Sequence, residues 1–141
     1  MLQNTLPSIM HASSGEKPST TAPSFIFMLD TATVRSIIDG NSNVTGMLVT
    51  SSDTCNVRGD LELMDSGYIH LEYMQKDVDV SDGDMIVTSN ISDKYIQGIL
   101  IGYVKNITED ANSLTQSGYL VPAVDFERLT EVLVIMQLKK K

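Results

Sequence analysis

The sequence predicts an all-β fold, a small β-barrel or β-sandwich of short antiparallel strands that follows a flexible N-terminal tail. Short apolar or alternating segments recur between turns rich in Gly, Asp, Asn and Ser, which is the pattern of such folds. Only residues 125–131, DFERLTE, are a candidate for a helical turn. Hydrophobic residues make up 42% of the 141 positions, so the chain can bury a core of its own.

The composition divides the chain into a tail and one β domain. Residues 1–23 hold three of the four prolines together with many Ser and Thr, and they show no hydrophobic period. Such a composition is typical of a flexible segment. The pattern changes at Ser24, where SFIFML begins, and we expect residues 24–141 to form the barrel domain.

The first half of this domain predicts strands and one hairpin. TVRSII at 33–38 ends in the turn cluster DGNSN, and GMLVTSS at 46–52 follows it. The segments NVRGDLELM and YIHLEYM predict a hairpin over 61–74 that turns at Asp65–Gly67. The face of that hairpin predicted to point inward carries Ile69, Leu71 and Tyr73.

The second half continues the pattern. DMIVTS at 84–89 and ILIGYVKNIT at 99–108 are predicted strands, and Gly102 marks a bulge or a close approach of two backbones. GYLVPAV is next, and its Pro122 predicts a strand end or an edge strand. EVLVIMQL at 131–138 is a nearly continuous apolar run, which predicts a strand covered on both faces.

The charge balance limits the partners that the chain can bind. The formal net charge is −8, and −7 of it lies between Asp53 and Asp84, where there are nine acidic and two basic residues. This balance excludes a broad basic surface for nucleic acid or anionic lipid. We interpret the acidic segment as solvated strand faces, and the alternative is a surface that meets a basic partner. The single cysteine, Cys55, excludes an intrachain disulfide and is expected to be a small buried hydrophobe.

The stretch KDVDVSDGDMIVTS places four aspartates in eight residues, which raises the question of a cation site. The calcium-loop template D-x-[DN]-x-[DN]-G-x5-E fits Asp77 and Asp79, but it puts Asp82 at the required glycine and Thr88 at the glutamate. We therefore predict no metal site and interpret Asp82–Gly83 as a turn into the next strand. One cysteine and two separated histidines provide no zinc cluster.

Motifs for catalysis and nucleotide binding are absent from the sequence. His11 lies in the predicted tail, so His70 is the residue on which a Ser-His-Asp triad would have to be built. Neither G-x-S-x-G nor the phosphate-binding motifs G-x-G-x-x-G and G-x-x-x-x-G-K-[ST] occur. The residues therefore favour a binding or scaffold protein without catalytic, cofactor-binding or metal-binding groups.

Three blocks of sequence carry a resemblance to one family. TVRSIIDGNSNVTGML at 33–48, DVDVSDGDMIVTSNISDKYIQGILIGYV at 77–104 and VPAVDFERLTEVLVI at 121–135 occur in this order. They resemble V-[RK]-L-I-x-D-x-N-S-x-V, A-D-[IV]-x-x-G-D-x-[VI]-x-T-S-G-x-G-G-x-[FY]-P-x-G-[IL]-x-[IV]-G and P-x-[AV]-[DN]-[FL]-x-x-L-x-x-V-x-[VI]. These patterns belong to the C-terminal part of MreC, the bacterial rod-shape-determining protein.

The resemblance implies structural roles at turns and strands. The chain departs from the family pattern at Gly40, Val78, Asn90 and Ile96, which loosens turn chemistry but keeps the strand frame. The positions that fall on the pattern and are expected to shape its turns are Asp39, Asn41, Ser42, Asp79, Gly83, Asp84, Thr88, Ser89, Gly98, Gly102, Pro122 and Asp125.

The function that the resemblance implies is a non-enzymatic scaffold on the extracytoplasmic side of the bacterial cytoplasmic membrane, which organises wall elongation and self-associates. The implied partners are MreD, a RodA-type glycosyltransferase, a class B penicillin-binding protein and, across the membrane, MreB. No cofactor, nucleic acid or small-molecule substrate is implied. Family members carry a membrane helix, a coiled coil and a first β subdomain, and this sequence shows at most the end of that subdomain. We therefore expect apolar edges at 24–38 and 115–138 to favour dimerisation or aggregation.

Two functions of other classes stay open as alternatives. One is a chymotrypsin-like barrel hydrolase that uses His70, which predicts an activity that His70→Ala abolishes. The other is a β-barrel adaptor of a secretion or efflux complex, against which the blocks at 77–104 and 121–135 argue.

Overall fold

The structure is a computed structural model and describes residues 10–13, 33–91 and 93–135. Within these ranges the chain is almost entirely β-structure, with one short α-helix, α1 (Leu61–Met64), and one 3₁₀ turn, η4 (Phe126–Arg128). The strands are β1 (Met10–Ser13), β2 (Thr33–Ser36), β3 (Asn43–Leu48), β4 (Thr54–Arg58), β5 (Ile69–Gln75), β6 (Met85–Thr88), β7 (Leu100–Glu109) and β8 (Thr115–Pro122).

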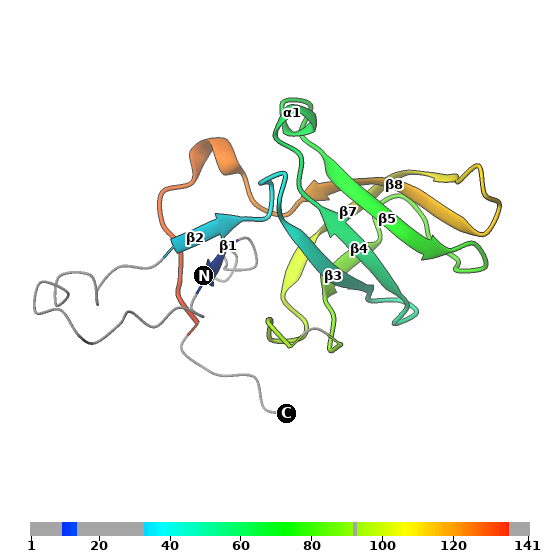
Figure 1. Cartoon of the computed structure of the whole chain (residues 1–141), viewed down its shortest axis with the longest axis horizontal. Coiled ribbons are helices and arrows are strands. Elements are labelled where there is room, and N and C mark those ends of the chain that lie inside the picture. The colour runs from blue at the N-terminus through cyan, green and yellow to red at the C-terminus, as the bar shows by residue number, and fades with distance from the viewer. Residues whose placement is uncertain (1–9, 14–32, 92, 136–141) are drawn as a thin grey trace, which may run out of the picture.

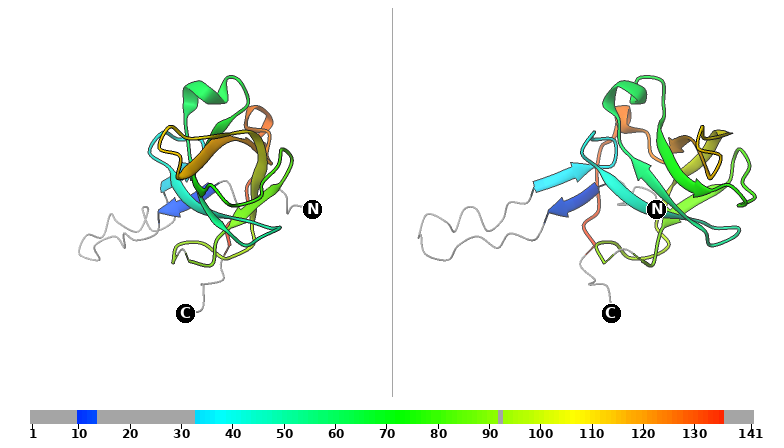
Figure 2. Two further views of the ribbon diagram at one scale, coloured as in Figure 1. Left: turned by 90° about the vertical axis from the view of Figure 1, so that its right-hand side faces the viewer. Right: turned by 45° about the vertical axis from the view of Figure 1, so that its right-hand side comes forward.

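Six strands close into one antiparallel barrel in the order β3-β4-β5-β8-β7-β6 (Figures 1 and 2). β3 pairs with β6 from Gly46↔Thr88 to Leu48↔Ile86, and this pairing closes the ring. A closed ring leaves the barrel without a free strand edge. The predicted all-β fold of short antiparallel strands is confirmed, and the barrel is the architecture that the chain adopts.

Most predicted strands are present with shifted ends. The segments predicted at 33–38, 84–89, 99–108 and 118–124 correspond to β2, β6, β7 and β8. The segment 46–52 is only half strand, because β3 begins at Asn43 and the chain turns after Leu48. The helical turn predicted within 125–131 is η4.

Alternate side chains of the barrel strands fill its interior. In β3 the burial pattern alternates from Val44 to Leu48, as expected for a strand with one face on a core. The inward side chains of the other barrel strands complete the core, together with Ile37, which follows β2. The buried hydrophobic residues are Ile37, Val44, Leu48, Cys55, Val57, Ile69, Leu71, Met74, Ile86, Ile101, Val104 and Leu120.

The predicted hairpin over 61–74 is wrong in its first strand, because Leu61–Met64 form α1. The Oδ1 atom of Asp60 accepts hydrogen bonds from the N–H groups of Glu62 and Leu63, both at 3.0 Å. An aspartate that satisfies the free N–H groups of a first turn starts a helix at that point. The sequence LELM alternates apolar and polar residues as a strand would. The hydrogen bonds of the Asp60 N-cap nevertheless stabilise a helical turn here.

The inward face of β5 also differs from the prediction. Ile69 and Leu71 are buried as expected, but Tyr73 is 68% exposed and Met74 takes the interior position. The register shifts between Leu71 and Met74, which marks a β-bulge, and Tyr73 has a φ angle of +60°. The extra residue of a bulge reverses the side to which the following residues point. Tyr73 is therefore an outward residue.

β1 and β2 form a separate two-stranded sheet beside the barrel, with register from Met10↔Ser36 to Ser13↔Thr33 (Figure 1). The expectation of a tail without structure over 1–23 therefore does not hold for Met10–Ser13. The other residues of that tail and the predicted segment 24–29 lie outside the described residues.

The apolar run predicted to be a covered strand is exposed over its described part. The exposed fractions of Val132, Leu133, Val134 and Ile135 lie between 40% and 69%, and these residues have no regular secondary structure. A strand needs a neighbour for its backbone hydrogen bonds, and no described strand pairs with this run. Residues 136–138 of the prediction lie outside the described residues.

Candidate interaction surface

Thr88, at the end of β6, fastens the loop that leads to β7. Its hydroxyl donates to the carbonyl oxygen of Ile96 at 2.5 Å and accepts from the N–H of Ile99 at 2.9 Å. The adjacent Ser89 is fully buried, and its hydroxyl accepts from the N–H of Ile91 at 3.1 Å. These bonds fix a loop whose Ile91 side chain is 67% exposed.

Two glycines of the same block allow backbone geometry that other residues resist. Gly98 has a φ angle of +88° and donates its N–H to the carbonyl oxygen of Thr88 at 3.0 Å. At Gly102, a Cβ atom would lie 2.2 Å from the carbonyl oxygen of Val121. Gly102 is thus a close approach of two backbones, and its register partner Pro122 is the last residue of β8.

Asp39 in the block 33–48 and Asp125 in the block 121–135 each stabilise a turn. The side chain of each accepts a hydrogen bond from the backbone N–H two residues further along the chain. Asp39 Oδ1 accepts from the N–H of Asn41 at 2.7 Å, and Asp125 Oδ1 accepts from the N–H of Glu127 at 3.0 Å at the start of η4. Ser42 is 8% exposed and donates its N–H to the carbonyl oxygen of Asp39 at 2.8 Å. These motif residues shape turns at separate places and are not brought together into one site.

The acidic loop between β5 and β6 is held by bonds within the protein. Gly83 has a φ angle of +97°, as the predicted turn requires. The Oδ2 atom of Asp84 accepts from the N–H of Ser81 at 2.9 Å. Asp82 lies 3.4 Å from the ammonium of Lys105 on β7. The carboxylate of Asp84 is therefore bound to the backbone of its own loop, and that of Asp82 is paired with a lysine. The motif residue Asp79 is exposed.

Reactive groups are few in the described chain. Cys55 points into the barrel core, and burial raises the pKa of its thiol to about 12, so the thiol is protonated at neutral pH. Across residues 33–91 and 93–135, no three side chains of His, Cys, Asp or Glu gather in a way that could hold a metal ion.

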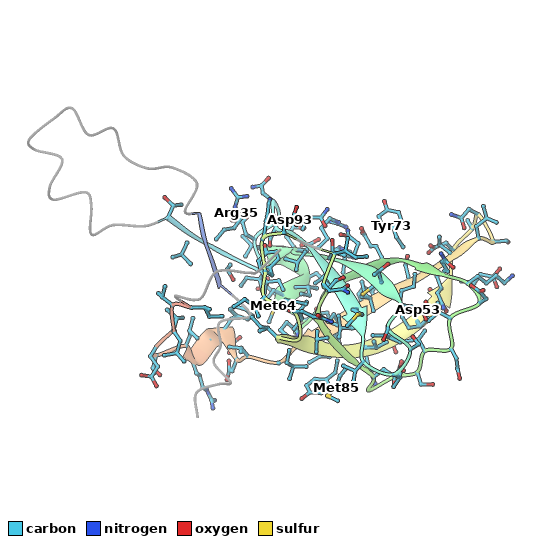
Figure 3. All side chains as sticks on the ribbon, turned by 90° about the horizontal axis from the view of Figure 1, so that it is seen from below. Arg35, Asp53, Met64, Tyr73, Met85 and Asp93 are labelled. Atoms are coloured by element: carbon cyan, nitrogen blue, oxygen red, sulfur yellow. The ribbon has the colours of Figure 1, made fainter. Side chains whose placement is uncertain are left out.

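The outer face of β6, β7 and β8 carries a row of large side chains. In the register, Met85 lies next to Tyr103, and Tyr103 lies next to Val121. Met85 is 43% exposed and Tyr103 is 39% exposed. Figure 3 shows Met85 on the outside of the barrel. Tyrosine and methionine in such positions are typical of surfaces that bind other proteins.

Two further tyrosines continue this row toward β5. Tyr119 of β8 is 36% exposed, and its ring centroid lies 5.6 Å from that of Tyr68. Tyr119 is also the register partner of Lys105, whose side chain pairs with Asp82. We name the five residues Met85, Tyr103, Val121, Tyr119 and Tyr68 the outer aromatic row.

Asp60 and His70 form a polar pair at the end of this row. The Nε2 atom of His70 lies 3.0 Å from Asp60 Oδ2, while the other carboxylate oxygen caps α1. The N–H of Leu63 and the imidazole of His70 hold the pKa of the Asp60 carboxyl below its ordinary value. The imidazole centroid is 6.3 Å from the ring of Tyr119.

The same pair supplies two of the three groups that a hydrolase built on His70 requires. Asp60, however, is the N-cap residue of α1, and the imidazole of His70 lies beside the ring of Tyr119. In the described part of the chain, no serine hydroxyl is hydrogen-bonded to His70.

Sequence reasoning missed the outer aromatic row and the Asp60–His70 pair. A signal for the row was present, since Tyr103 and Tyr119 each precede a buried residue, Val104 and Leu120, and so fall on the solvent side of their strands. Nothing in the sequence indicated that Asp60 is the partner of His70. The two residues come together only because the α1 turn between them brings the chain back to β5.

The geometry defines a class of protein. A closed antiparallel barrel holds its motif residues in turns, loops and strands, and it exposes tyrosine and methionine side chains on one outer face. This is a small closed β-barrel domain. Among the described residues, no helix is long and apolar enough to cross a membrane.

The comparison with protein families identifies the family. The model described as rod shape-determining protein MreC, barrel core, matches residues 28–136. The chain belongs to the MreC family.

Curated relatives agree with this assignment. The cell shape-determining protein MreC of Listeria monocytogenes is 28% identical over 139 residues, which cover 88% of this chain and 45% of that protein. The MreC of Bacillus subtilis (strain 168) is 39% identical over 57 residues, which cover 40% of this chain and 20% of that protein. The chain thus spans less than half the length of these relatives.

Solved structures share the fold. The crystal structure of MreC from Pseudomonas aeruginosa is similar with a TM-score of 0.57 and 18% identity, over 65% of this chain and 57% of that one. The structure of the Listeria monocytogenes MreC is similar with a TM-score of 0.59 and 24% identity, over 67% of this chain and 45% of that one.

Proposed function

We propose that this chain acts in maintaining rod shape as a non-catalytic barrel domain that organises the wall-elongation machinery through protein contacts. The observation that carries the proposal is the match of residues 28–136 to the barrel core of a rod shape-determining family. The geometry is consistent with it, because the motif residues shape turns, loops and strand contacts while Met85, Tyr103 and Tyr119 are exposed on the outside of the barrel.

The contact surface that we propose is the outer aromatic row. Its centre, Tyr103 and Tyr119, is flanked by ion pairs between Arg58 and Glu72 at 2.9 Å and between Lys105 and Asp82 at 3.4 Å. Protein interfaces concentrate binding energy in central tyrosines, while paired charges at the rim contribute little to affinity and more to orientation.

The proposed partners follow from the family. They are MreD, a RodA-type glycosyltransferase, a class B penicillin-binding protein and, across the membrane, MreB, together with further copies of this chain. The proposed place is the extracytoplasmic side of the cytoplasmic membrane, where wall synthesis takes place.

The proposal is tested by replacing the gene at its own locus. Cells that carry the double variant Tyr103→Ala and Tyr119→Ala should lose their rod shape, measured as an increased cell width. The matched control is Thr54→Ala with Asn56→Ala, which changes the outer face of β4 and should preserve rods. Immunoblots and thermal melting of both purified variants must show similar protein levels and similar midpoints.

Two results would contradict the proposal. If the Tyr103→Ala and Tyr119→Ala strain keeps its rod shape, the outer aromatic row is not the contact surface. If cells keep their rod shape after deletion of the whole gene, the proposed role in rod shape is wrong. A strain with His70→Ala separates the hydrolase alternative, since the scaffold predicts normal rods and the hydrolase predicts the phenotype of a deletion.

A further inference from the structure

Met85, the first residue of β6, carries a sulfur atom that solvent can reach. Residues 33–91 and 93–135 contain four methionines, and Met85 is the exposed one among them, with an exposed fraction of 43%. Met74 is fully buried in the core, Met64 packs against that core, and Met47 on β3 is half-buried. An oxidant must reach the sulfur of a thioether to react with it, so exposure favours Met85 over the other three.

The backbone of Met85 is held from both sides. Its carbonyl oxygen accepts from the N–H of Val49 at 3.1 Å, and on the other side Met85 is the register partner of Tyr103 on β7. The next residue of β6, Ile86, is fully buried and takes the interior position. The Met85 side chain is therefore fixed on the outer face of the closed barrel, as Figure 3 shows, and cannot withdraw into the core.

The neighbours of Met85 on this face are exposed as well. Val49 is 46% exposed and Tyr103 is 39% exposed. Side chains of register partners lie about 5 Å apart on one face of a sheet, which is a distance at which a sulfur and an aromatic ring attract each other. Met85 and Val49 thus make the surface around Tyr103, a central residue of the outer aromatic row, apolar.

We propose that Met85 is a site of reversible oxidation by peroxide, and that its sulfoxide weakens the protein contact made through the outer aromatic row. This inference rests on the proposed function, because it names a regulation of the contact surface proposed above. Methionine is the residue of this row whose polarity a mild oxidant changes in a reversible reaction.

The chemical step is an oxygen transfer to sulfur. A lone pair of the Met85 sulfur attacks one oxygen of hydrogen peroxide, an S–O bond forms as the O–O bond breaks, and the second oxygen leaves as water after a proton transfer. The sulfur loses two electrons, and the peroxide gains them. A methionine sulfoxide reductase restores the thioether with two electrons from thiols.

The sulfoxide changes the surface from apolar to polar. Water solvates the new oxygen as long as Met85 is exposed, and a partner that covers the row removes that water. The side chain of Val49 has no donor that could replace it. Because burial of a polar oxygen without a hydrogen bond is unfavourable, we expect oxidation to weaken the contact about tenfold.

The first experiment measures which methionine reacts. The full chain is treated with hydrogen peroxide, and peptide mapping by mass spectrometry follows the sulfoxide at each position over time. Met85 should be oxidised well before Met64 and Met74, with an unchanged thermal midpoint, and methionine sulfoxide reductases for both sulfoxide epimers should reverse the reaction. Oxidation of Met85 no faster than that of Met74 in the folded chain would overturn the inference.

The second experiment replaces the gene at its own locus. Met85→Gln puts a polar oxygen on an unbranched side chain, as the sulfoxide does, and should increase cell width. The matched control is Met47→Gln, which makes the same change on the outer face of β3 and should preserve rods. Immunoblots and thermal melting of both purified variants must show similar protein levels and similar midpoints. The inference is overturned if both strains widen equally.

The third experiment removes the sulfur and keeps an apolar side chain, by Met85→Leu. Cells with the unmodified chain should widen during exposure to a sublethal concentration of hydrogen peroxide and recover after its removal. Cells with Met85→Leu should show no such change relative to their own untreated cells. Equal widening of the two strains would overturn the inference. Normal rods with Met85→Gln, beside the loss of rods with Tyr103→Ala and Tyr119→Ala, would overturn it and leave the proposed function standing.

Discussion

Asp60 and His70 are joined at 3.0 Å between the start of α1 and the outer face of β5, and Asp60 uses its second oxygen to cap the helix. The Asp60 carboxylate therefore ties the loop between β4 and β5 to the outer face of the barrel. α1 has no fully buried residue, although Met64 packs against the core, so this carboxylate is a second attachment of the turn.

The first prediction concerns the two roles of Asp60. Asp60→Asn keeps a good N-cap but removes the negative charge that faces His70, whereas Asp60→Ala removes both. We expect Asp60→Ala to lower the thermal midpoint by several degrees and Asp60→Asn to lower it less. Thermal melting monitored by circular dichroism measures this order, and a larger loss for Asp60→Asn than for Asp60→Ala would contradict it.

The second prediction concerns acid. The pKa of the Asp60 carboxyl is lower in the folded chain than its ordinary value of 3.8, because of the N–H of Leu63 and the imidazole of His70. Such a carboxyl stabilises the fold at pH values above its unfolded pKa, and this contribution is lost as the pH falls through the folded pKa. Lys76 lowers the pKa of Glu109 in the same sense. Urea midpoints should therefore fall below about pH 4, and Asp60→Asn should flatten that fall without abolishing it.

The third prediction contrasts two glycines. Gly102→Ala places a Cβ atom 2.2 Å from the carbonyl oxygen of Val121, and backbone atoms must move to admit it. We expect a loss of roughly 2–3 kcal/mol in the free energy of unfolding, as for an overpacked interior. Gly40→Ala is the control, since nothing lies within 4 Å of its Cβ, and it should be neutral or stabilising by up to about 1 kcal/mol. Equal effects of the two substitutions in urea unfolding would contradict the close approach at Gly102.

Local patterns predicted the strands that bury one face, because period-two alternation follows from the geometry of a strand. Val104 and Leu120 are buried as that rule requires. The rule also gave a strand at Leu61–Met64, where Asp60 instead starts a helical turn. Four residues are too few for a pattern to distinguish these two structures.

Non-local pairing set the limits of prediction elsewhere. The run at 131–138 has the composition of a central strand, yet its described part is exposed, since composition does not supply a neighbouring strand. The outer aromatic row depends on the register between β6, β7 and β8, which the sequence does not state. The positions of turns such as Asp82–Gly83 were readable, because their chemistry is local.

The fourth prediction tests the bulge that the alternation did not reveal. Tyr73 has a φ angle of +60°, which asparagine tolerates better than tyrosine and which a β-branched residue strongly resists. We expect Tyr73→Asn to be at least as stable as the unmodified chain and Tyr73→Val to lose roughly 1–2 kcal/mol. Urea unfolding of both variants is the measurement. If valine were tolerated as well as asparagine, Tyr73 would not occupy this conformation.

The last prediction concerns the loop that carries Ile91. Thr88→Val keeps the shape of the side chain but leaves the carbonyl oxygen of Ile96 and the N–H of Ile99 without their partner, at a cost of roughly 1–3 kcal/mol. Thr88→Ser keeps the hydroxyl and loses only a methyl group, worth about 1 kcal/mol. Because these two losses overlap, the deciding measurement is amide hydrogen exchange at Ile99. Exchange there should accelerate in Thr88→Val and stay near the unmodified rate in Thr88→Ser after correction for global stability. Equal protection at Ile99 in the two variants would mean that the backbone of the loop, and not the Thr88 hydroxyl, holds it in place.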